Sequence, residues 1–124
     1  MSLILSAALI AAQAFAPQAV APQAASPQPV GLSMQQQTAM RCSVAIAMAA
    51  ERQKAGKGDP ARPDLSQRGR EFFVRSLARL MEETGMTRQA LMQAATQEAA
   101  DLQDGGNLEQ VMPACLLMLN ASGL

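Results

Sequence analysis

Beyond residue 32, apolar side chains recur at intervals of three and four residues, which is the spacing of one face of an α-helix. Glycine, proline and capping residues divide this part of the chain into four predicted helices, at residues 34–55, 65–84, 88–103 and 108–119. No segment shows the period-two alternation of β-branched residues that strands need. The pattern predicts an all-α domain over residues 33–124, with a compact four-helix arrangement as the simplest packing.

Residues that accept hydrogen bonds at helix starts precede all four predicted helices. The predicted N-caps are Ser33, Asp64, Thr87 and Asn107. A glutamine stands three residues after the first, second and fourth of these, which completes the pattern of a capping box. The boundaries therefore rest on local chemistry as well as on the apolar period.

Several residues predict how the helices end or bend. Gly56 and Gly85 follow the first two helices, and Met86 is placed for the apolar contact of a Schellman motif. Gly69, early in the second helix, either costs up to about 1 kcal/mol relative to alanine or permits close packing. Pro113 is predicted to kink or restart the fourth helix. The run 115–119 is apolar all round, so we expect it to be the most buried segment.

The first sixteen residues have the features of a signal peptide. An apolar run spans residues 3–12, and small residues allow cleavage after Ala14 or Ala16, the former preferred because Pro17 follows the latter. No lysine or arginine precedes the run. A membrane anchor and a buried helix are the alternatives, but a span needs about 20 apolar residues and proline interrupts this one earlier. No lipidation motif precedes Cys42, so we expect a soluble exported product.

Residues 17–32 are predicted to form a disordered linker rich in Pro, Gln and Ala. The Pro-Gln pair recurs at positions 17, 22 and 27, and no charged residue occurs before Arg41. Each proline removes a backbone donor and favours extended geometry in its predecessor. A semi-extended tether follows from this composition, and a proline-rich docking motif is the alternative.

The two cysteines are predicted to form a disulfide. Cys42 falls within the first predicted helix and Cys115 within the fourth. If the leader directs export, the compartment is the periplasm or the exterior, where a disulfide is the default state. Two buried free thiols are one alternative. A redox-active pair is another, although no C-x-x-C motif is present and only Arg41 is placed to stabilise a thiolate.

Composition narrows the chemistry that the chain supports. The 124 residues include no histidine, tryptophan or tyrosine. This excludes histidine-based triads, histidine-ligated zinc or haem, and most aromatic platforms for nucleic acid. The adjacent Glu82 and Glu83 point about 100° apart on a helix, so they do not form a paired acid and base. Asp101 and Asp104 share a helix face, where we interpret them as solvated carboxylates. We predict no enzyme activity and no cofactor.

Nine methionines raise the possibility of a copper site, because thioethers suit Cu(I). None of those beyond the leader forms an M-x-M or M-x-x-M motif. Methionine is also an adaptable filler of apolar cores. We therefore predict core packing and no metal site.

The formal net charge is zero, but the charges are unevenly placed. Residues 41–79 hold nine basic and four acidic side chains, and residues 80–124 hold one basic and six acidic ones. Either the two halves pack with complementary surfaces, or a basic face meets an acidic partner. A candidate for such a basic face is the stripe of Arg68, Arg75 and Arg79, which are spaced by seven and four residues. A solvated face paired with neighbouring glutamates is the simpler interpretation.

The functional prediction is a non-enzymatic protein-interaction module, periplasmic or secreted. Zero net charge argues against nucleic acid, and cleavage would leave no stable membrane anchor. The plan of leader, small helical domain and one long-range disulfide resembles those of periplasmic acid-stress chaperones and of small immunity proteins. This resemblance implies a holdase or an inhibitor as alternatives, and no functional residue is carried over from it. A homodimer is possible because alanine-rich helices allow close approach.

Overall fold

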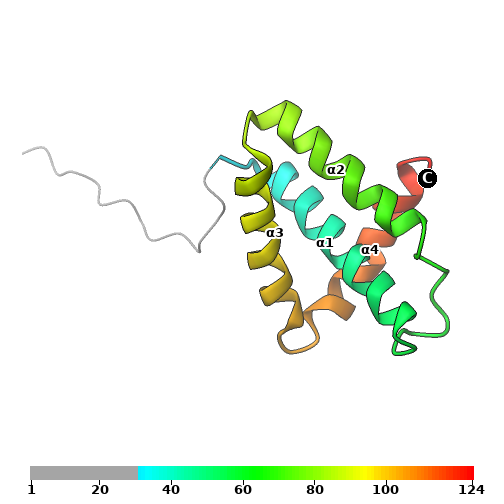
Figure 1. The fold of residues 1–124 in the computed structure, drawn as a ribbon. Coiled ribbons are helices and arrows are strands. Elements are labelled where there is room, and N and C mark those ends of the chain that lie inside the picture. The colour runs from blue at the N-terminus through cyan, green and yellow to red at the C-terminus, as the bar shows by residue number, and fades with distance from the viewer. Residues whose placement is uncertain (1–30) are drawn as a thin grey trace, which may run out of the picture.

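The computed structural model describes residues 31–124, and over that range it is all-helical. Its four helices follow one another along the chain as α1 (Met34–Lys54), α2 (Arg68–Thr84), α3 (Arg88–Gln103) and α4 (Asn107–Ala121) (Figure 1). The predicted all-α class and the four helices are thereby confirmed. The predicted signal peptide and all but the last two residues of the predicted linker lie outside the described residues.

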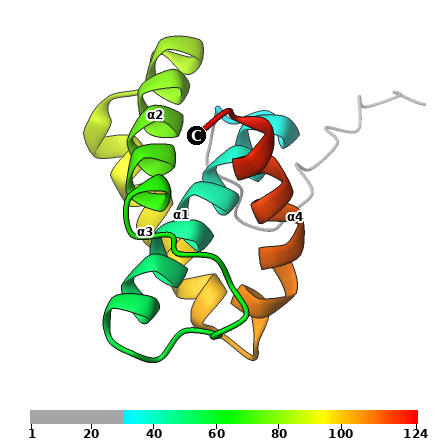
Figure 2. The ribbon, with the colours of Figure 1, turned by 90° about the vertical axis from the view of Figure 1, so that its right-hand side faces the viewer.

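Helix α1 is the centre of the molecule. It packs against α2, α3 and α4, and Figure 2 shows α2 and α3 on one side of it and α4 on the other. Five consecutive residues of α1, from Cys42 to Ile46, are buried. A helix surrounded on several sides loses the one-sided apolar stripe of a surface helix. Ser43 and Ala45 in this stretch suit such a position, because small side chains let neighbouring helices approach.

The prediction that residues 115–119 are the most buried segment is wrong. Only Cys115 and Leu119 are buried there, and Leu117 is 71% exposed. Helix α4 lies at the periphery and covers one side of α1. The number of helices that surround an apolar run depends on packing between distant segments, which the run itself does not encode.

Two of the predicted N-caps are confirmed. Ser33 Oγ accepts from the backbone N–H of Gln36 at 3.1 Å, and the Gln36 side chain accepts from the Ser33 N–H at 3.0 Å. Thr87 Oγ1 accepts from the Ala90 N–H at 3.1 Å and begins α3. Local side-chain chemistry therefore determines where α1 and α3 begin.

Asp64 does not cap α2. The helix begins at Arg68, and its N-cap residue, Gln67, makes no side-chain cap bond. Asp64 Oδ1 instead accepts from the Ser66 N–H at 3.0 Å within the loop. Leu65 is fully buried, and its N–H donates to Gln53 Oε1 at 2.8 Å. Burial of Leu65 thus holds this stretch in the loop and delays the helix.

Asn107 does not cap α4 either. The N-cap is Gly106, whose φ of 82° lies in the left-handed region. Asn107 is the first residue of the helix, and its Nδ2 donates to the carbonyl of Asp101 at 2.9 Å. The amide therefore closes the end of α3 instead of the start of α4. Helix α4 continues through Pro113 as a single helix, so the proline does not restart it.

Gly85 ends α2 in the left-handed conformation, as predicted, with a φ of 70°. The predicted Schellman pattern does not form, because the Met86 N–H donates to Thr84 Oγ1 at 3.1 Å. That hydroxyl in turn donates to the Leu80 carbonyl at 2.6 Å. The threonine hydroxyl thus stands between the two backbone groups that a Schellman motif would join directly.

Candidate functional site

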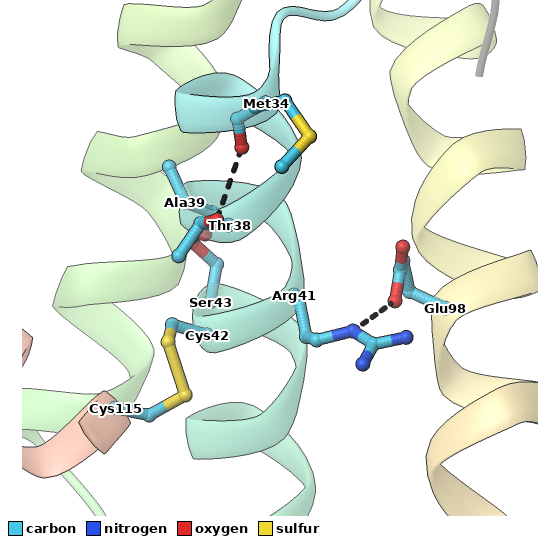
Figure 3. The surroundings of a disulfide bond; sticks show 8 residues. All are labelled: Met34, Thr38, Ala39, Arg41, Cys42, Ser43, Glu98 and Cys115. Carbon is cyan, nitrogen blue, oxygen red and sulfur yellow. Dashed lines mark hydrogen bonds and ion pairs between the residues drawn. A yellow bond between two sulfur atoms is a disulfide. The ribbon is translucent and has the colours of Figure 1, made fainter. Parts of the chain in front are cut away.

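The two cysteines form a buried disulfide between the central and the last helix. Cys42 of α1 and Cys115 of α4 are bonded, with a Cα–Cα distance of 4.9 Å and a sequence separation of 73 (Figure 3). The two residues are 4% and 1% exposed. A crosslinked pair fits an oxidising compartment. Its burial favours a structural role over thiol exchange with solutes.

The side chain of Arg41 points away from the disulfide. The sequence suggests this residue as the one placed to stabilise a Cys42 thiolate. Figure 3 shows the side chains of Arg41 and Cys42 leaving α1 in different directions. Arg41 reaches α3, where its Nε lies 3.1 Å from Glu98 and its Nη2 lies 2.6 Å from Asp101. The guanidinium therefore serves helix pairing and does not activate sulfur.

The charge asymmetry is resolved by pairing between the two halves of the domain. Besides the Arg41 contacts, Arg62 lies 2.7 Å from Glu109, and Arg52 lies 3.7 Å from the same carboxylate. The Arg62 side chain is only 7% exposed, so this pair is partly shielded from water. The interpretation that the basic and acidic halves pack with complementary surfaces accounts for these contacts.

The structure does not bring the three candidate arginines together as free cations. Arg68 turns toward the end of α4, where its Nε donates to the Leu124 carbonyl at 2.8 Å and its Nη2 to Asn120 at 3.0 Å. Arg75 pairs with Glu71 at 3.0 Å, and Arg79 pairs with Glu83 at 2.8 Å. An anionic partner for this stripe stays a prediction.

Glu83 is an exposed carboxylate whose hydrogen bonds lower its pKa. Hydrogen bonds from Arg79 and then Gln36, the latter at 3.3 Å, lower the pKa of Glu83 below its ordinary value of 4.5. The contribution of these bonds to stability is present above that value and is lost as the pH falls through the lowered pKa. Glu83 thus links α2 to α1 through the side chain of Gln36.

An apolar groove lies where α2 and α3 diverge from their shared turn. It has a volume of about 430 Å³, and its floor is formed by Val44, Ala47 and Met48 of α1. Phe73 of α2 forms one wall. The opposite wall belongs to α3 and consists of Met92, Ala95, Thr96 and Ala99. The polar groups Glu51, Arg52 and Gln103 complete the lining. It is the strongest candidate for a binding site in the described part of the chain.

Sequence reasoning missed this groove because it assigned the methionines to the core. Met92 is in fact 40% exposed, and Met48 and Phe73 are half-buried. A signal was available in the turn of three residues between α2 and α3, which ties the helices together at one end only. Both helices pack on α1, so their separation further along exposes its apolar surface.

A second hollow of about 420 Å³ lies between α2 and the two ends of the domain, at the start of α1 and the end of α4. Phe72, Leu80 and Met118 supply its apolar surface. Its polar lining includes Gln36, Arg79 and Glu83, which already bond to one another. These groups are satisfied within the chain, so the hollow is a weaker candidate than the apolar groove.

Comparison with known proteins adds no family assignment. The chain matches no protein-family model, no curated protein and no solved structure. Within residues 31–124, no helix has both the length and the apolar content needed to cross a membrane. Over the same range, no three His, Cys, Asp or Glu side chains lie close enough to hold a metal ion together.

Proposed function

We propose that this protein is an exported, non-enzymatic interaction module that binds another protein through the groove between α1, α2 and α3. The observation that carries the proposal is the open apolar surface formed by Met48, Phe73 and Met92. Half of the twenty charged side chains of the domain already form ion pairs with each other. A contiguous exposed apolar patch with polar groups at its rim is typical of an interaction site. Methionine side chains suit such a site, because they adapt their shape to a partner.

The chemistry of the lining supports binding more than catalysis. The apolar side chains occupy the floor and both walls, and the charged groups at the groove are Glu51 and Arg52. Arg52 is also within 3.7 Å of Glu109, so its charge is shared with α4. An apolar cleft with a few polar groups at its edge is the usual form of a surface that receives an apolar side chain or a short helix.

The buried disulfide supports the compartment in the proposal. A crosslink between Cys42 and Cys115 persists in an oxidising environment, such as the periplasm or the exterior. The predicted signal peptide would direct export to that compartment. Intact-mass measurement of the protein expressed with its own first residues tests this part, because cleavage after Ala14 or Ala16 shortens the product and reduction adds two hydrogens.

Site-specific photocrosslinking in living cells tests the binding surface. A photoreactive residue at Thr96, in the groove wall, should capture a defined partner, and Met92→Glu should abolish that product by placing a charge in the apolar cleft. Leu117→Glu is the matched control, since it adds the same charge at an exposed apolar position of α4 outside the groove. A product that survives Met92→Glu would contradict the proposal. Capture of many unfolded proteins regardless of either substitution would favour the holdase alternative.

A further inference from the structure

The outer side of α2 carries an apolar stripe that no other element of the described residues covers. Val74 is 58% exposed, Met81 is 37% exposed, and Ala78 between them is also exposed. Leu77 is half-buried beside the stripe. Figure 1 shows α2 along one edge of the molecule, so this side is open to a partner. The stripe lies on a different side of α2 from Phe73, which faces the groove.

The spacing of the stripe is that of a helix-pairing seam. Val74, Ala78 and Met81 follow one another at intervals of four and three residues, as do d, a and d positions of a heptad. Ala78 is in the middle, where a small side chain lets two helices approach closely. Arg75 and Glu82 each follow one of the two d residues directly, so both stand at e positions on the same edge of the seam.

The charges on this edge can pair with the same edge of a second copy only if the two helices are antiparallel. In an antiparallel pair that crosses at Ala78, each Arg75 lies opposite the partner's Glu82, and each Val74 lies near the partner's Met81. In a parallel pair, an e position lies beside the partner's g position, so Arg75 would meet the like charge of Arg70, and Glu82 would meet the apolar Leu77. No ion pair engages Glu82 among the described residues. Arg75 uses one nitrogen on Glu71 at 3.0 Å and keeps further donors free.

We propose that two copies of this chain associate through α2, antiparallel and about a two-fold axis at Ala78. The interface is isologous, which is the commonest form of a homodimer. It joins a short apolar seam to two symmetry-related Arg75–Glu82 pairs. Few apolar residues contribute, so the dimer is weak and depends on concentration. The proposal does not require the groove to bind a partner, because the groove opens on another side of α2.

Sedimentation velocity of the purified protein over a range of concentrations tests the dimer. Arg75→Glu and Glu82→Arg should each weaken association about tenfold, because each reversal breaks two symmetry-related pairs, and an exposed pair is worth up to about a fivefold change in affinity. The double variant Arg75→Glu/Glu82→Arg should restore association. Ala78→Arg should abolish it by keeping the helices apart.

Arg88→Glu is the matched control, because Arg88 is an exposed arginine at the start of α3, away from the seam. It should leave association unchanged. Circular dichroism and thermal melting of each variant check that it folds, which is the expected result for substitutions at exposed positions. A protein that stays monomeric to about 1 mM, a concentration at which even weak association is visible, would overturn the proposal. So would a dimer that is insensitive to Ala78→Arg, or a double variant no better than its parents.

Discussion

Gly69 shows how one residue decides the distance between two helices. A Cβ atom at this position would lie 3.1 Å from Ile46 Cγ2 and 3.4 Å from Ala50 Cβ of α1. Ile46 is fully buried, so it has little room to move. Of the two roles that the sequence left open for this glycine, close packing is the one that the structure supports. The cost of glycine in a helix is offset by the contact of α2 with the central helix.

Gly69→Ala is expected to lower the free energy of unfolding by about 1 kcal/mol. The gain in helix propensity is at most about 1 kcal/mol, whereas overpacking a tight contact costs about 2 kcal/mol. Chemical denaturation of the two proteins measures the difference. An alanine variant that is more stable than the parent would show that α2 moves away from α1 at little cost.

At the scale of the helix, the four starts divide into two kinds. The starts of α1 and α3 are determined by Ser33 and Thr87, whose side chains bond to backbone within their own helix. The starts of α2 and α4 depend on distant contacts, through the burial of Leu65 and the amide bond of Asn107 to α3. A capping motif therefore predicts a helix start well only where nothing outside the segment competes for the same residues.

Thr87→Ala should lower the free energy of unfolding by about 1 kcal/mol, because it removes the acceptor for the Ala90 N–H at the start of α3. Thr96→Ala is the matched control for stability in the same helix. Its hydroxyl donates to the Met92 carbonyl at 2.9 Å and caps nothing, so its loss should have almost no effect. Thermal or chemical denaturation distinguishes the two variants, and equal losses would contradict the cap.

At the scale of the molecule, one central helix and one crosslink organise the fold. Helix α1 contacts the other three, and the disulfide ties it to α4, which covers only one side of it. The ion pair of Arg41 also connects α1 to α3, and the ion pair of Arg62 connects the loop after α1 to α4. A domain this small with a core of mainly Leu, Met and Ala gains much of its stability from such a staple.

Removing the disulfide by Cys42→Ala/Cys115→Ala should lower the free energy of unfolding by about 4 kcal/mol, the chain-entropy value for a long closed loop. Guanidinium denaturation of the parent and of the double variant measures this loss. Reductant should not react with the folded parent at low denaturant, because both cysteines are buried, and should act once unfolding begins. Equal stability of the two proteins would show that α4 is held by packing alone.

The features that depend on residues close in the sequence, or on residue counts, could be predicted from the amino-acid sequence. They include the number and order of the helices, the caps at Ser33 and Thr87, the left-handed glycines and the pairing of the only two cysteines. Apolar periodicity and capping reflect interactions between residues close in the sequence. Two cysteines allow only one intramolecular disulfide. For the same reason, the opposite charges of the two halves pointed to complementary surfaces before their partners were known.

The features that depend on distant neighbours were decided by the tertiary structure. They include the central place of α1, the exposure of Leu117, the retention of Leu65 in the loop, and the apolar groove. Burial is a property of all the segments around a residue, so an apolar run has the same sequence whether one helix or three cover it. The candidate binding surface arises where two helices separate over a third, and no single segment of the chain contains it.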